Sequence, residues 1–127
     1  MFEFTFEDKI ESKYCYVGDF HDPLAVVQDR ETLLYGYIDK SGKEVIPCKY
    51  LEANDFSEGL AVVKSELGYF YIDRFDQNIF SKYFLNAQPF FKNLGAVQNE
   101  EKGWGYISKN GLFIIAQDNA ICFPNKE

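Results

Sequence analysis

Apolar and polar residues alternate at the start of this chain, as they do in strands that bury only one face. Residues 2–6 read Phe-Glu-Phe-Thr-Phe, which predicts an edge strand at the N-terminus. Short apolar runs predict two further strands, at 14–17 and 120–123. A sustained helical period is missing throughout, and the best candidate for a helix, residues 81–94, is rich in aromatics and broken by a proline. The pattern predicts a mainly β protein.

One stretch of this strand pattern returns twice in weaker form. Residues 35–39 read Tyr-Gly-Tyr-Ile-Asp, residues 69–73 read Tyr-Phe-Tyr-Ile-Asp, and residues 104–108 read Trp-Gly-Tyr-Ile-Ser. The copies begin 34 and then 35 positions apart. A regular period of this size indicates a repeat protein, in which each unit buries its apolar face against its neighbours.

A second motif, an aromatic residue followed by a three-residue turn and an Ala-Val strand, also occurs three times. We place its copies at Phe20, Phe56 and Phe91. We therefore predict about three degenerate β-meanders of 34–36 residues, stacked as a curved sheet, an open barrel or a short solenoid. All belong to one domain, 1–127. Within it the predicted segments are 1–34, 35–66, 67–101 and 102–127.

The turns and the most apolar strands lead to two further expectations. Residues 39–42 and 108–111 end in glycine, which adopts the positive φ that such turns require. The middle copy lacks this glycine, so we expect its turn to be longer, distorted, or to place Asn78 in a left-handed conformation. Residues 45–46 and 113–116 are apolar at successive positions, so we expect both faces of those strands to be covered.

Composition narrows the choice of partner and compartment. Twenty Asp and Glu against thirteen Lys and Arg give a net charge of -7, which disfavours nucleic acid and favours a basic protein surface. No apolar run reaches the length of a membrane span, and the acidic start does not resemble a signal peptide. We expect a cytoplasmic protein that does not bind membranes. Cys15, Cys48 and Cys122 are expected to be unpaired core residues.

The repeated motif resembles the WG repeat of bacterial proteins, named for a Trp-Gly pair that stands here at Trp104-Gly105. Residues 35–66 resemble the whole repeat, whereas the other copies are degenerate or partial. The Trp is replaced by Tyr35 and Tyr69, and the following Gly by Phe70. The resemblance implies repeated β-meanders without a catalytic centre, and close packing at the replaced glycine is in doubt.

We find no convincing catalytic, metal or cofactor site in the sequence. His21 is the only histidine, and it falls in a predicted turn. Asp39 and Asp73 occupy equivalent positions, but a hairpin turn explains them, because an Asp side chain there binds its own backbone. The glycines are isolated rather than clustered as a phosphate-binding loop requires. We therefore expect a protein that is not an enzyme and needs no cofactor.

Acidic residues are the candidates for binding a basic protein. Carboxylates flank Phe20 and Phe56 at matching positions, and stacking would align them along one edge. Further carboxylates would add to the same negative electrostatic field if they lie near that edge. The candidate set is Asp19, Asp22, Glu52, Asp55, Glu58, Glu100 and Glu101.

Three functional hypotheses follow from these observations. The leading one is a non-catalytic, protein-binding module, in its specific form an immunity-type inhibitor that covers the cationic cleft of a basic, nuclease-like bacterial toxin. The alternative is a module that binds cell-envelope glycans through an aromatic platform of Trp104 and Tyr106, which lie on one face of a strand. The third is a structural repeat fragment that associates with itself through edge strands.

Overall fold

The computed structural model describes residues 13–21 and 23–115. The strands predicted at 2–6 and 120–123, together with Asp22 and Cys122, lie outside the described residues. The described chain forms three antiparallel sheets, each built from strands consecutive in sequence and none closed into a barrel. This confirms the predicted mainly β repeat fold.

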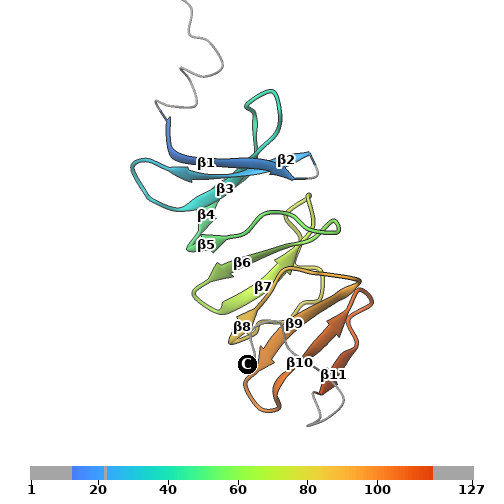
Figure 1. The fold of residues 1–127 in the computed structure, drawn as a ribbon. Coiled ribbons are helices and arrows are strands. Elements are labelled where there is room, and N and C mark those ends of the chain that lie inside the picture. The colour runs from blue at the N-terminus through green and yellow to red at the C-terminus, as the bar shows by residue number, and fades with distance from the viewer. Residues whose placement is uncertain (1–12, 22, 116–127) are drawn as a thin grey trace, which may run out of the picture.

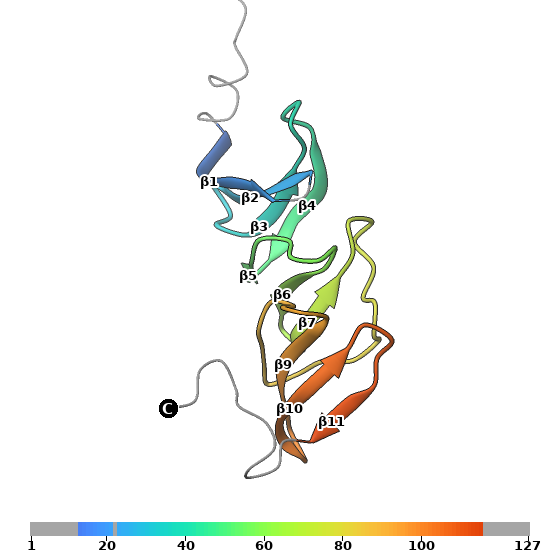
Figure 2. The same ribbon diagram turned by 45° about the vertical axis from the view of Figure 1, so that its right-hand side comes forward.

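Each sheet is one module of the stack, and the modules follow one another from the N-terminal to the C-terminal end in Figures 1 and 2. Module 1 contains β1 (Tyr14–His21), β2 (Leu24–Asp29), β3 (Tyr35–Ile38) and β4 (Glu44–Tyr50). Module 2 contains β5 (Glu52–Ala53), β6 (Ala61–Ser65) and β7 (Gly68–Ile72). Module 3 contains β8 (Asn86–Ala87), β9 (Leu94–Asn99), β10 (Gly103–Ser108) and β11 (Phe113–Ile115).

The register of the central hairpins shows how the three modules correspond. Ala25 pairs with Ile38 in module 1, and Ala61 pairs with Ile72 in module 2. In module 3 the same place is held by Gly95, opposite Ile107. The modules thus share one hairpin with a common register.

This register corrects one alignment made from sequence. The isolated bridges Ser57–Leu60 and Phe91–Leu94 are equivalent, so the residue that matches Phe56 is Phe90 rather than Phe91. Phe56 and Phe90 are buried, whereas Phe91 is 70% exposed. The prediction was one residue out because two phenylalanines stand side by side in the third copy.

Among the described residues, two core clusters lie between modules, and a third, smaller one lies within module 1. Ala61 and Val63 face module 1, while Val62, between them on β6, faces module 3. β2 is also buried on both faces. Consecutive apolar residues therefore mark the strands that are covered on both sides.

The two strands that we expected to be covered on both sides are not. Val45 on β4 is 40% exposed, and Ile114 and Ile115 on β11 are exposed to a similar extent. Both strands lie at an edge of their sheet, in the first and the last module of the described stack, so the described chain has no further module beyond them. Whether both faces of a strand are covered therefore depends on its position in the sheet and in the stack, which the apolar pattern does not reveal.

One tyrosine in each of the first two modules fixes the next module. The Tyr37 ring meets Phe56 edge to face, with 4.9 Å between centroids, and its hydroxyl donates to the Asn54 carbonyl at 2.6 Å. Tyr71 makes the same two contacts one module later, with Phe90 at 5.0 Å and the Gln88 carbonyl at 2.6 Å. These pairs satisfy the buried hydroxyls and set the spacing of the stack.

The turn of module 2 keeps the length of the other two but places a different residue in the left-handed conformation. Gly42 and Gly111 have φ near 90° (88° and 89°), and the equivalent residue is Asp76, with φ 65°. The expectation that Asn78 would hold this place was wrong. The Asp76 carboxylate accepts a hydrogen bond from the Tyr50 hydroxyl and pairs with Lys49. Those contacts hold a non-glycine residue where a side chain is disfavoured.

Of the cysteines with described positions, Cys15 is not the core residue that we expected, whereas Cys48 packs against the core cluster within module 1. Cys15 is exposed on β1, and Cys48 is partly buried on β4. Both are free thiols. Partial burial raises the pKa of Cys48 to about 11, which keeps this thiol protonated and a weak nucleophile.

Candidate protein-binding edge

The stack has two long edges, formed by different sets of strand connections. At one edge lie the turns at 21–24, 57–60 and 91–94, on the right of Figure 1. At the other lie the connections β2–β3, β6–β7 and β9–β10, on the left of Figure 1. We call the first the aromatic turn edge and the second the glutamate edge. The predicted acidic residues divide between them.

Asp55 and Glu58 lie on the aromatic turn edge, where both contact a neighbouring module. Asp55 lies 3.3 Å from the His21 imidazole of module 1. Glu58 accepts hydrogen bonds from the backbone N–H groups of Lys92 at 2.7 Å and Asn93 at 2.9 Å in module 3. The Lys109 ammonium adds an ion pair with Glu58 at 3.4 Å. Part of the predicted acidic set therefore joins modules to one another. Asp19 is exposed on the edge strand β1.

The contacts of Glu58 lead to a prediction about pH. The N–H of Asn93, with that of Lys92 and the Lys109 ammonium, holds the pKa of Glu58 below its ordinary value of 4.5. Because the folded pKa is the lower one, the stabilisation is complete above the ordinary value and is lost as pH falls through the folded pKa. We expect Glu58→Gln to lower the thermal midpoint at pH 7, and we expect this difference from wild type to shrink as the pH falls below 4.5.

Thermal unfolding followed by circular dichroism checks this prediction. Glu66→Gln is the control, because the Glu66 side chain is exposed and makes no hydrogen bond or ion pair among the described residues. An equal midpoint for Glu58→Gln and wild type at pH 7 would show that the contact between modules 2 and 3 contributes nothing.

The remaining predicted carboxylates lie on the glutamate edge. Glu52 begins β5 and receives the Tyr69 hydroxyl at 2.9 Å. Glu100 and Glu101 occupy the β9–β10 turn and are exposed. Glu31 in the β2–β3 turn and Glu66 in the β6–β7 turn join them, so every module contributes exposed carboxylates to this edge. Sequence analysis missed these two, although both lie in polar segments between predicted strands.

Exposed leucines accompany the glutamates at matching places in successive modules. Leu33 and Leu67 lie in the β2–β3 and β6–β7 turns, 56% and 71% exposed. Leu51 and Leu85 precede β5 and β8 and are 45% and 54% exposed. Members of each pair are 34 positions apart, so the repeat itself places them in two rows. This 34-residue spacing of exposed leucines is the sequence signal that marks them.

Cations lie on this edge as well: Lys102 follows Glu101 in the β9–β10 turn and is exposed, with its ammonium 6.0 Å from the centroid of the Phe113 ring. Lys64 lies 3.8 Å from Glu52, and the Arg30 guanidinium donates to the Tyr14 carbonyl at 3.0 Å. By contrast, the carboxylates of Glu31, Glu66, Glu100 and Glu101 form no ion pair within the part of the chain that the structure describes. The glutamate edge therefore combines exposed apolar side chains with several carboxylates that form no ion pair among the described residues.

Turn chemistry accounts for the other polar candidates. The Asp39 carboxylate accepts the N–H groups of Ser41 and Lys43, and that of Asp73 accepts those of Phe75 and Gln77. The predicted turn role of the two aspartates is thereby confirmed. Among residues 13–21 and 23–115, we find no group of three or more His, Cys, Asp or Glu side chains that could hold a metal ion.

Trp104 and Tyr106 share one face of β10, and each is partly buried. Ile107, on the other face, belongs to the core with module 2. The two rings therefore face away from module 2, toward the C-terminal end of the stack. Their use as a platform for glycans stays a prediction.

A family model described as WG containing repeat matches residues 35–66. This confirms the resemblance for the segment in which the motif is most complete. The matched segment contains β3 and β4 of module 1 together with β5 and β6 of module 2, so one sequence repeat spans the junction of two sheets. The search of curated proteins found no match, and neither did the search of solved structures. The described residues include no helix suited to crossing a membrane.

Proposed function

Because residues 35–66 are a WG containing repeat in a stack that leaves one edge acidic and apolar, we propose that the protein is a non-catalytic module that binds a basic protein. The observation that carries this proposal is the composition of the glutamate edge. Exposed leucines provide apolar surface for the centre of an interface, and surrounding carboxylates attract a cationic partner and orient it. The net charge of -7 adds long-range attraction for a cationic partner.

The specific form of the proposal is an immunity-type inhibitor of a bacterial toxin. A nuclease-like toxin domain has a cationic cleft that binds phosphates, and an acidic edge of three turns is complementary to such a cleft in charge. Inhibition by covering the cleft requires no chemistry from the bound protein. A cytoplasmic location suits an inhibitor that protects the cell producing it.

The first experiment identifies the partner and the edge that binds it. The tagged protein is used to capture partners from its native host at low and high salt, and the captured protein is purified. Affinity is then measured for wild type, for Glu66→Lys/Glu100→Lys on the glutamate edge, and for Asp19→Lys/Asp55→Lys away from it. Both double variants change the net charge equally, so the pair separates a local contact from a general charge effect.

We expect a basic partner whose dissociation constant rises at least about tenfold in Glu66→Lys/Glu100→Lys, equal to about 1.4 kcal/mol. The Asp19→Lys/Asp55→Lys variant should bind within a few-fold of wild type. Failure to capture a basic protein at either salt concentration would contradict the proposed function. A loss confined to Asp19→Lys/Asp55→Lys would assign binding to the other carboxylates. If the partner is a nuclease, its activity on DNA or RNA must fall when the complex forms.

A further inference from the structure

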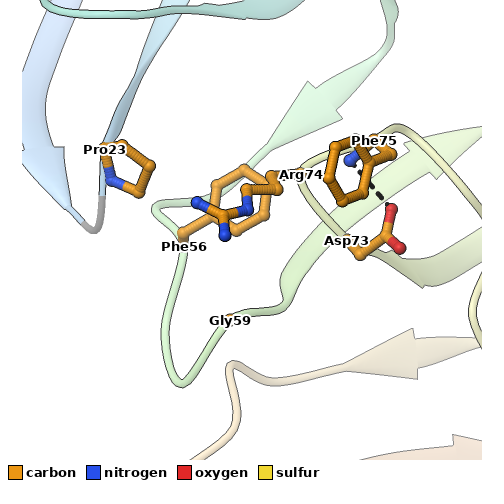
Figure 3. A pocket seen from close by; sticks show the side chains of 6 residues that line it. All are labelled: Pro23, Phe56, Gly59, Asp73, Arg74 and Phe75. Carbon is orange, nitrogen blue, oxygen red and sulfur yellow. Dashed lines mark hydrogen bonds between the residues drawn. The ribbon is translucent and has the colours of Figure 1, made fainter.

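A pocket of about 320 Å³ opens on the aromatic turn edge, between modules 1 and 2. Figure 3 shows the residues around it, which come from three turns that are distant in sequence. The volume is at the low end of the range for sites that bind small molecules, about 300 to 1,000 Å³. It suits one ring with a short polar group rather than a nucleotide. The lining residues are Pro23, Phe56, Gly59, Asp73, Arg74 and Phe75.

The pocket has an apolar interior and an aromatic rim. Phe56 is 3% exposed and is held edge to face against Tyr37. A Cβ placed on Gly59 would meet no atom within 4 Å, so the wall there is open. Phe75 stands at the rim with 74% of its surface exposed. An exposed phenylalanine beside a preformed pocket provides a contact surface for an aromatic ligand.

Arg74 supplies the one basic side chain among the described residues that line the pocket, next to the Asp73 carboxylate. Its guanidinium lies 5.8 Å from the centroid of the Phe75 ring and forms no hydrogen bond or ion pair in the described part of the chain. Figure 3 shows the side chain reaching from its turn toward Pro23. The Asp73 carboxylate is bound by the backbone of its own turn. A free guanidinium pairs with a carboxylate through two parallel hydrogen bonds.

The equivalent turns in modules 1 and 3 show that this arrangement is specific to module 2. The place of Arg74 is taken by Lys40 and by Lys109, and Lys109 is bound to Glu58. The place of Phe75 is taken by Ser41 and Asn110. Only in module 2, among the three described turns, does an arginine next to a phenylalanine border a pocket between modules.

From this geometry we infer that the pocket binds a small aromatic carboxylate, with the ring over Phe56 and Phe75 and the carboxylate on Arg74. The ligand chemistry is the same for a free aromatic acid and for the C-terminal phenylalanine of a peptide. This inference does not depend on the proposed function, because the pocket lies on the aromatic turn edge, whereas the proposed interface lies on the glutamate edge.

Heteronuclear NMR titration tests the inference with four probes. Phenylpropionate represents the free acid, and N-acetyl-Gly-Gly-Phe represents a peptide C-terminus. The corresponding amides, phenylpropionamide and N-acetyl-Gly-Gly-Phe-amide, keep the ring but lack the charge. We expect the backbone signals of Gly59 and Phe75 to shift with at least one acid, and the matching amide to bind at least about tenfold more weakly. The tighter of the two acids identifies the source.

Two substitutions and two matched controls complete the test. Arg74→Gln should weaken binding of the acid at least about tenfold without changing that of the amide, and Phe75→Ser should weaken both. Lys40→Gln, at the same turn position in module 1, and Phe91→Ser, another exposed phenylalanine, should leave binding unchanged. The inference is overturned if neither acid shifts these signals at about 10 mM, or if acid and amide bind equally well. Partner binding through the glutamate edge should be the same in Arg74→Gln and wild type.

Discussion

Tyr37→Ala is expected to lower the free energy of unfolding by about 3–5 kcal/mol, the cost of removing a large aromatic side chain from a packed core. Tyr37 is fully buried between modules 1 and 2. Its loss removes the ring contact with Phe56 and the hydrogen bond to the Asn54 carbonyl. Urea unfolding followed by circular dichroism measures the effect.

Two further variants separate the contributions of Tyr37. Tyr37→Phe keeps the ring and leaves the Asn54 carbonyl without its donor, so it should cost about 1–3 kcal/mol. Tyr16→Ala is the matched control, because Tyr16 is 50% exposed on β1, and it should change stability by no more than about 0.5 kcal/mol. A value for Tyr37→Ala within the range of this control would contradict the role of Tyr37 in joining the modules.

Gly36→Ala is expected to destabilise the protein by about 1–3 kcal/mol, as overpacking in a closely packed site does. A Cβ on Gly36 would lie 2.4 Å from the Ile46 carbonyl oxygen and 2.7 Å from the Pro47 carbonyl carbon. Both atoms belong to the backbone of β4, so relief requires the strand to move. Chemical unfolding measures the change. Gly18→Ala is the control, because its nearest neighbour is the flexible Tyr16 hydroxyl at 3.1 Å. Equal stability of Gly36→Ala and Gly18→Ala would show that β4 moves away from the added methyl group without loss of stability.

The middle module shows what a side chain at this position does to the sheet. Phe70 replaces the glycine, and the segment that should form a fourth strand makes only two isolated bridges, Ile72–Asn78 and Tyr69–Phe84. The corresponding pairs in module 1, Ile38–Glu44 and Tyr35–Tyr50, belong to the β3–β4 strand pair, although its register shifts on both sides of Tyr37. The Phe70 ring packs against Tyr50 of module 1. Module 2 thus loses part of a strand and gains a contact between modules.

The sequence predicted the repeat because strand spacing and turn chemistry are local properties. The period of Tyr35 and Tyr69 located the hairpins, and the positions of Asp39 and Asp73 located their turns. Which strand is covered on both faces depends on its place in the sheet, so Val45 and Ile114 could not be distinguished from Val62 by apolarity alone. The aromatic pattern alone likewise could not distinguish the buried Phe90 from the exposed Phe91.

The candidate site was less predictable because it depends on which turns meet at an edge. Equal spacing of Asp19 and Asp55 suggested a row of carboxylates, but spacing does not show that Asp55 and Glu58 contact adjacent modules. The division of the acidic residues between two edges follows from strand direction. The pocket beside Arg74 combines three turns, and no local pattern marks it.

The central claim is that the three modules form one cooperative stack, which holds the turns of both edges in place. Trp104 is the only tryptophan and lies in module 3, so its fluorescence follows that module alone, whereas circular dichroism follows all three. Urea unfolding of wild type and Tyr37→Ala with both probes tests the claim most directly. We predict that the substitution between modules 1 and 2 lowers the midpoint equally by both probes. A fluorescence midpoint that stays at the wild-type value, while the dichroism midpoint falls, would contradict a single stack.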